Sequence, residues 1–162
     1  MPDLVGISPT RMHTRKWPTP STRGAQPFLR RPFRKPRPGY AEVYGAIIHC
    51  RATGAFCFVQ GRRTGKWSFP KGHLKESNES PFECVTREVG EEIGYDELPT
   101  PLRGMPLRVG YYYMFEVPHE FALAPRDTNE VGEAGWFTLE QMRQMNMNID
   151  ASFFRTLLGA SP

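Results

Sequence analysis

The sequence predicts an α/β domain that follows a basic, proline-rich arm. First, short segments rich in Val, Ile, Tyr and Phe, bounded by glycine and polar turns, are typical of β-strands. Second, residues 80–94 carry agreeing start and stop signals for an α-helix. Third, a length of 162 residues with 39% hydrophobic residues suits one ordinary core, that is, one domain plus a tail.

The first 38 residues differ in composition from the rest of the chain. They contain eight of the 16 prolines, which prevent a continuous helix and remove backbone donors from any strand. Residues 1–40 also hold nine of the 21 Lys and Arg residues but one of the 17 acidic residues. We therefore predict a disordered or polyproline-like arm over residues 1–38 and a domain over residues 39–162. An organelle transit peptide is the alternative, although the prolines oppose the amphipathic helix that it needs.

Two strands are predicted at the start of the domain, over residues 41–50 and 54–60. Apolar anchors recur in both, namely Val43, Ile47 and Ile48 in the first and Phe56, Phe58 and Val59 in the second. Residues 61–65 form a basic turn. Residues 67–69 are a short extended piece, because Pro70 disfavours helical backbone in the residue before it.

A second group of elements is predicted after residue 106. Residues 107–117 are rich in Val, Tyr and Phe and indicate a long strand, and residues 131–138 indicate a short one. We expect an irregular loop at residues 118–129 between them. Two helices follow, at residues 139–145 and 150–158, and the second has Asp150 as its cap and ends at Gly159.

The helix predicted over residues 80–94 has the clearest local signals. Ser80 is a good N-cap, and Glu83 three residues later completes a capping box. Pro81 falls at the first helical position, where a missing backbone N–H costs nothing. Gly94 suits the left-handed residue that ends a helix.

Two stripes run along this helix when its residues are placed about 100° apart. The apolar stripe can bury against a sheet and consists of Phe82, Val85, Val89 and Ile93. The acidic stripe consists of Glu88, Glu91 and Glu92, which repel each other, and Gly90 costs a further ~1 kcal/mol. A hard divalent cation would relieve this repulsion, because it binds carboxylate oxygens. A solvated acidic face is the alternative.

Residues 72–95 as a whole resemble the Nudix box. They read GHLKESNESPFECVTREVGEEIGY, whereas the box has a glycine, a loop, a glutamate, seven residues and then Arg-Glu-apolar-x-Glu-Glu-x-Gly-apolar. Glu79 and Arg87 have the required seven residues between them, and residues 87–95 match the second half throughout. One departure is that six residues, not five, separate Gly72 from Glu79; a loop tolerates such an insertion easily.

This resemblance implies both a fold and a metal site. Nudix enzymes have an α/β/α sandwich around a mixed β-sheet, and their box forms a loop, a helix and a second loop. By position, Glu88, Glu91 and Glu92 would bind Mg²⁺ or Mn²⁺, and the Gly72 carbonyl would complete the metal shell. Arg87 and Glu79 would pair and hold the loop against the helix.

The resemblance also implies a further glutamate after the long strand, as base or extra metal ligand. Residues 129–137, NEVGEAGWF, are similar to that region. Glu130 is therefore the first candidate, Glu133 the second and Glu120 the third. Plain surface charge is the alternative for each of them.

Candidate substrate contacts surround the box. Lys71 stands beside the box glycine and could meet a phosphate, and Arg62 and Arg63 could do so from the basic turn. Tyr113 belongs to an aromatic run whose alternate side chains point to opposite faces of the sheet. One face is core, and the other could offer a ring for stacking on a base. Ordinary surface charge is the alternative for the two arginines.

Flanking motifs narrow the substrate class. Residues 67–72, WSFPKG, with residues 44–48 and 58–61, resemble the catalytic domain of mRNA-decapping enzymes, whereas Lys71-Gly72-His73 resembles diadenosine-tetraphosphate hydrolases. We expect hydrolysis of a phosphoanhydride bond in a nucleoside-diphosphate-linked substrate, foremost the 5′ cap of RNA. Hydrolysis of dinucleoside polyphosphates or nucleoside triphosphates is the alternative. A non-catalytic nucleotide- or RNA-binding module is the third hypothesis.

Composition also bears on partners and location. The basic arm could attract RNA by neutralising phosphates. Three cysteines, Cys50, Cys57 and Cys84, lack the spacing of a disulfide framework or zinc site, so we expect free thiols in a reducing, intracellular, cytoplasmic setting. No run approaches the ~20 apolar residues of a membrane span, and no apolar segment near Met1 resembles a secretory signal. The oligomeric state stays open.

Overall fold

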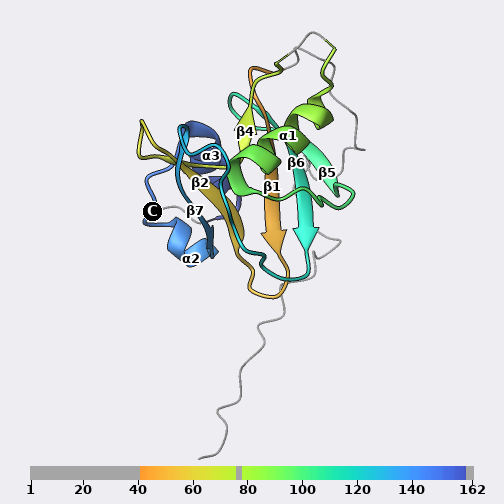
Figure 1. Ribbon diagram of the computed structural model, residues 1–162. Helices are drawn as coiled ribbons and strands as arrows, with labels where there is room; N and C mark the ends of the chain where they lie inside the picture. Colours follow the sequence, from red (N-terminus) through yellow and green to blue (C-terminus); the bar gives the residue numbers. More distant parts are fainter. Residues whose placement is uncertain (1–40, 76–77, 160–162) are drawn as a thin grey trace, which may run out of the picture. The chain divides into compact units, whose positions relative to one another are not determined.

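The computed structural model describes residues 41–75 and 78–159 and shows a sheet with helices packed against it (Figure 1). In chain order the elements are β1 (Tyr44–Cys50), β2 (Phe56–Gly61), β3 (Trp67–Ser68), β4 (Lys71–Gly72), α1 (Pro81–Ile93), β5 (Arg103–Pro106), β6 (Tyr111–Val117), β7 (Val131–Phe137), α2 (Leu139–Met142) and α3 (Ile149–Leu157). The predicted arm lies outside the described residues. None of the helices described is both long enough and apolar enough to cross a membrane.

The seven strands in the described part of the chain form one mixed sheet. β1 runs parallel to β6 along its whole length, from Tyr44 beside Tyr111 to Cys50 beside Val117. β5 is antiparallel to β6, and β2 is antiparallel to β1, β3 and β7. The short strand β4 pairs antiparallel with the first residues of β1, where Gly72 lies beside Tyr44. The box therefore starts at the end of the sheet where β1 begins.

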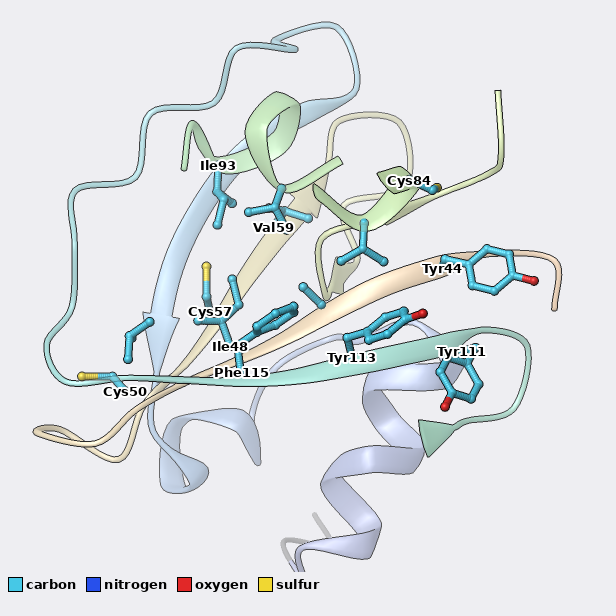
Figure 2. Close-up of a cluster of buried hydrophobic side chains, with 14 of the residues drawn as sticks. Tyr44, Ile48, Cys50, Cys57, Val59, Cys84, Ile93, Tyr111, Tyr113 and Phe115 are labelled. Atoms are coloured by element: carbon cyan, nitrogen blue, oxygen red, sulfur yellow. The ribbon is translucent and has the colours of Figure 1, made fainter. Parts of the chain in front are cut away.

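Helices cover both faces of this sheet (Figure 1). On the α1 face the buried cluster includes Ile48, Val59, Val85, Val89, Ile93 and Phe115, as Figure 2 shows in part. On the face of α2 and α3 it includes Ile47, Phe58, Phe69, Tyr112, Met142 and Phe154. Ile47 and Ile48 belong to opposite clusters because neighbouring strand residues point to opposite faces. The predicted α/β/α sandwich around a mixed sheet is confirmed.

The local chemistry of helix α1 agrees with the sequence prediction. Ser80 caps it, accepting a hydrogen bond from Glu83 N over 3.2 Å, while Glu83 Oε2 accepts one from Ser80 N over 2.7 Å. Gly94 has φ +70 and ends the helix in the left-handed region. The apolar stripe is buried except at Phe82, which is 37% exposed although its ring packs edge-on against Tyr113.

Other predicted elements differ from the structure. β4 was not predicted, because two residues carry too little pattern. The strand expected over 107–117 begins only at Tyr111, because residues 107–110 form a turn closed by a bond from Leu107 N to Gly110 O. A further strand, β5, precedes this turn and was not predicted. Asn148, not Asp150, caps α3, by accepting a hydrogen bond from Ala151 N over 2.9 Å. Asp150 is instead buried, as are the three cysteines, which are free thiols as expected.

Candidate active site

Strand β4 places the start of the box directly against helix α1. Gly72 lies so close to the Glu88 carboxyl group that a Cβ at this position would overlap it. One residue earlier, the backbone N–H of Lys71 donates to Glu92 Oε2 over 2.9 Å. A side chain at position 72 would therefore have to displace the Glu88 carboxyl group, and a glycine leaves that group its place.

Arg87 is the centre of the contacts that hold the box loop. Its Nε and Nη2 donate to the two carboxylate oxygens of Glu79 over 2.7 and 3.1 Å, and Nη2 also donates to the His73 carbonyl over 3.0 Å. This pairing lowers the pKa of Glu79 and raises the pKa of Arg87. The ion pair that the resemblance implies thus forms despite the additional loop residue.

The three glutamates of the acidic stripe lie in different environments. Glu88 and Glu92 are each 8% exposed, and burial raises the pKa of Glu88 and raises the pKa of Glu92 to about 8. Glu91 is more open and accepts a hydrogen bond from Lys75 Nζ over 2.9 Å. Arg87 Nη1 donates to both Glu88 and Glu91. Two side-chain cations therefore offset the charge of the stripe.

The chemistry of these donors fits a hard divalent cation. Within residues 41–75 and 78–159 no three acidic, His or Cys side chains converge on one point as they stand. Glu88 and Glu91 turn toward Arg87, and Glu92 turns toward Lys71 N. Two buried carboxylates whose ionised forms are disfavoured gain most from a cation, and an oxygen-only donor set suits Mg²⁺ or Mn²⁺.

The three candidates for the further glutamate lie in different places. Glu130 N donates to Asp127 Oδ1 over 3.3 Å, and Asp127 N donates to the Glu91 carbonyl over 2.9 Å, so the backbone at Glu130 is tied to α1. Glu133 pairs with Gln60 in the β2–β7 ladder and points to the face opposite α1. Glu120 accepts a hydrogen bond from Thr53 Oγ1 over 2.7 Å, beyond the end of β1 that is remote from β4. Of the three, the structure brings Glu130 to the box.

The three basic residues that were candidates for phosphate contacts lie in different environments. Lys71 is half-buried and lies against Glu92, and Arg63 is exposed in the turn after β2. Arg62 instead directs its guanidinium to backbone carbonyls, with Nε donating to Thr128 O over 2.8 Å.

The expectation that Tyr113 offers a ring for base stacking is wrong. Tyr113 is 2% exposed and lies under α1, where its ring packs edge-on against Phe82 and Tyr111 (Figure 2). Tyr112, which points to the other face, is also fully buried. Because helices cover both faces of the sheet, neither ring presents a face to a substrate.

A loop anchor was missed by the sequence analysis. The backbone N–H groups of Arg126 and Asp127 both donate to the Glu91 carbonyl over 2.9 Å. The Arg126 guanidinium pairs with both carboxylate oxygens of Asp96, and this pair lies where a Cβ of Gly90 would be. Asp127 Oδ1 also accepts from Asn129 N over 3.1 Å, a turn that the Asp-x-Asn spacing could have indicated.

Together these features define a class: an α/β/α domain with buried carboxylates on one face of a capped helix, facing a glycine of a short strand. The family model for the NUDIX domain matches residues 40–157. The chain therefore belongs to the Nudix hydrolase family.

Two similar proteins have names that refer to mRNA decapping and to RNA pyrophosphate hydrolysis. mRNA-decapping enzyme subunit 2 of Saccharomyces cerevisiae is 28% identical over 109 residues, which are 62% of this chain and 11% of that protein. RNA pyrophosphohydrolase of Helicobacter pylori is 31% identical over 88 residues, 54% of this chain and 56% of that protein. The chain thus spans less than two thirds of either relative.

Solved structures show the same fold. A crystal structure of a C. elegans Ap4A hydrolase binary complex has a TM-score of 0.53 and 19% identity, and the match covers 72% of this chain and 96% of that one. At this identity the likeness bears on the fold alone.

Proposed function

We propose that this Nudix domain is a pyrophosphohydrolase that uses Mg²⁺ or Mn²⁺ and cleaves the 5′ cap of RNA to release a nucleoside diphosphate. The observation that carries the proposal is the position of Glu88, Glu91 and Glu92 on one face of α1, against β4. This arrangement concentrates oxygen donors where a cation and a phosphate chain can meet.

The residues of the site have separate tasks in this reaction. A bound cation would supply charge that offsets the phosphate oxygens and makes water easier to deprotonate. Glu130 takes the proton from the attacking water as general base. Lys71 and Arg63 neutralise phosphate charge during the attack. Arg87 and Glu79 keep the box loop in place against α1.

Two observations favour a capped RNA over a free nucleotide. The WSFPKG motif that resembles decapping enzymes spans β3 and β4 and therefore ends at the site. The basic residues of the predicted arm suit binding to an RNA backbone. A 5′-phosphorylated RNA is the second candidate substrate, because the name of the Helicobacter pylori relative also refers to RNA and to pyrophosphate hydrolysis.

A hydrolysis panel with Mg²⁺ and with Mn²⁺ tests the proposal. It compares cap-labelled RNA, 5′-triphosphorylated RNA, free cap dinucleotide, diadenosine tetraphosphate and nucleoside triphosphates, with products identified by mass. We expect capped RNA to yield a nucleoside diphosphate while the free compounds survive. Cleavage of the free nucleotides with the RNA untouched would replace the proposal by small-molecule pyrophosphohydrolysis.

Two variants complete this test. Glu91→Gln/Glu92→Gln should lose hydrolysis, whereas Glu97→Gln, an exposed position just beyond α1, should not. Deletion of residues 1–38 should weaken RNA binding and flatten its salt dependence, because fewer phosphates are neutralised. Unchanged affinity after the deletion would reject a role of the arm in binding RNA.

A further inference from the structure

Arg62 has three hydrogen bonds to the segment that carries Glu130. Its backbone N–H donates to the Glu130 carbonyl over 2.8 Å. Its Nε donates to the Thr128 carbonyl over 2.8 Å, and Nη2 to the Val131 carbonyl over a longer 3.5 Å. The residue therefore contacts the backbone on both sides of Glu130 as well as at Glu130 itself.

Regular strand pairing does not hold this segment. The β2–β7 ladder shifts register between Gln60 and Gly61, so that Gly61 pairs with Val131 and Gly132 is the additional residue of a β-bulge. Residues 128–130 precede β7 and lie beyond the ladder. The carbonyls of Thr128 and Glu130 instead accept hydrogen bonds from Arg62.

A second anchor holds the same segment at Asp127. Asp127 N donates to the Glu91 carbonyl over 2.9 Å, and Asp127 Oδ1 accepts from Glu130 N over 3.3 Å. The segment is therefore fixed to α1 at Asp127 and to the β2–β3 turn at Arg62. Releasing either anchor frees one end of it.

The chemistry of arginine matches this task. A planar guanidinium presents several N–H donors in fixed directions and reaches two carbonyls at once, whereas a lysine ammonium is a single point charge on a flexible stem. Arg63, the next residue, is equally basic and exposed in the same turn. The two neighbours thus provide a matched comparison.

We propose that Arg62 is a positioning residue that acts through Glu130 and is not a contact of the substrate phosphates. This inference rests on the proposed function, because it takes Glu130 to be the general base. Holding a base within hydrogen-bond reach of the attacking water affects the chemical step more than substrate binding.

Steady-state kinetics of Arg62→Ala, Arg62→Lys and Arg63→Ala on the cleaved RNA substrate test the assignment. Arg62→Ala should lower kcat roughly five- to thirtyfold, the effect of losing one or two net hydrogen bonds, with KM changed by less than about twofold. Arg62→Lys should lie between wild type and Arg62→Ala. Arg63→Ala should raise KM in a salt-dependent way. A raised KM with unchanged kcat in Arg62→Ala would make Arg62 a substrate contact and overturn the proposal.

A double-mutant cycle separates this inference from the proposed function. If Arg62 acts through Glu130, Arg62→Ala should cost less than about twofold in kcat in a Glu130→Gln background. An additive loss would overturn the role of Arg62 and leave Glu130 as base. Full activity of Glu130→Gln alone would instead reject Glu130 as base, and with it the proposed chemistry.

Amide hydrogen exchange provides a reading that does not depend on hydrolysis. Exchange of residues 126–131 should rise in Arg62→Ala, because the clamp on their carbonyls is lost. It should not rise in Arg63→Ala or in Arg51→Ala, whose guanidinium pairs with Glu116. Unchanged exchange in Arg62→Ala would overturn the clamp itself.

Discussion

The Glu92 carboxylate accepts a hydrogen bond from the backbone N–H of Lys71 over 2.9 Å, and this contact joins α1 to β4. Glu92 is 8% exposed, and burial raises its pKa to about 8. A single N–H satisfies one oxygen of a buried carboxylate but does not neutralise its charge. Glu92 therefore holds the box strand and also keeps a strong acceptor available to a cation.

Glu92→Gln should remove most hydrolysis without unfolding the protein. Glutamine keeps the shape and the oxygen that accepts from Lys71 N, but it lacks the charge that a cation needs. We expect kcat to fall by roughly 100-fold or more. In EDTA the variant should be at least as stable to urea as wild type, because glutamine cannot ionise and burial already disfavours the ionised form of Glu92. A strong loss of stability would show that the charge itself holds the fold.

Metal addition should stabilise the folded protein through the same residue. A ligand that binds only the folded state adds ~2.7 kcal/mol at 100 times its Kd, so Mg²⁺ or Mn²⁺ should raise the Tm of wild type. The rise should be smaller in Glu92→Gln and unchanged in Glu97→Gln. Equal rises in all three proteins, measured by differential scanning fluorimetry, would exclude Glu92 as a ligand.

Arg87→Lys should destabilise the box although it keeps the positive charge. Lysine loses the planar fork that contacts Glu79 twice and the His73 carbonyl once. We expect a loss of about 1–3 kcal/mol in the free energy of unfolding, and a lower kcat because the loop is displaced. Arg126→Lys is the control for stability, because its pair with Asp96 is exposed and should contribute little. Equal losses in both variants would contradict this account.

The parts of the fold that could be predicted from the sequence depend on contacts between residues that are close together along the chain. Ser80, Glu83 and Gly94 define α1 because capping contacts reach only three or four residues along the chain. The resemblance to the Nudix box implied the pairing of Glu79 and Arg87, and both residues belong to that one contiguous motif. Motif and capping signals lie in contiguous sequence, so the box and its helix could be predicted without knowledge of tertiary contacts.

The parts that could not be predicted depend on contacts between distant segments. Tyr113 is buried because two helix layers cover β6, and alternation along one strand does not reveal the second layer. Asp150 looked like a helix cap, yet it accepts hydrogen bonds from residues 38 to 41 positions earlier. The choice of Glu130 over Glu133 depends on which face of the sheet the side chains of β7 point to. The bulge opposite Gln60 and Gly61 changes the register there. Each of these is fixed by packing.

Asp150→Asn should cost more stability than an ordinary cap substitution. Asp150 is 1% exposed and accepts hydrogen bonds from Val109 N, Gly110 N and Tyr112 Oη over 2.8, 2.9 and 2.8 Å. An amide turns one acceptor into a donor that faces N–H groups, so we expect a loss of about 2–4 kcal/mol. Tyr112→Phe, which removes one of the three bonds, should cost about 1–2 kcal/mol.

Urea unfolding of these two variants, with Glu140→Gln on the exposed face of α2 as control, measures both effects. The control should change little. A cost for Asp150→Asn that is no larger than that for Tyr112→Phe would mean that the two backbone N–H groups contribute nothing to stability.

His49 should make the stability of the fold depend on pH. Its ring packs against Phe56 with centroids 4.8 Å apart, and burial lowers the pKa of His49, while nearby Glu116 partly opposes the shift. The unfolded chain therefore takes up a proton near the ordinary pKa of ~6.5 before the folded protein does. Stability contributed by the neutral ring is present above that pH and is lost as the pH falls toward the lower folded value.

His49→Gln should consequently have a flatter stability profile than wild type. Urea unfolding at several pH values between about 8 and 5 should show the stability difference between the two proteins shrinking as the pH falls below ~6.5. His119→Gln, at an exposed position, should follow wild type. A difference that grows toward low pH would mean that a charged pair between His49 and Glu116, 3.6 Å apart, outweighs the cost of burying the imidazolium.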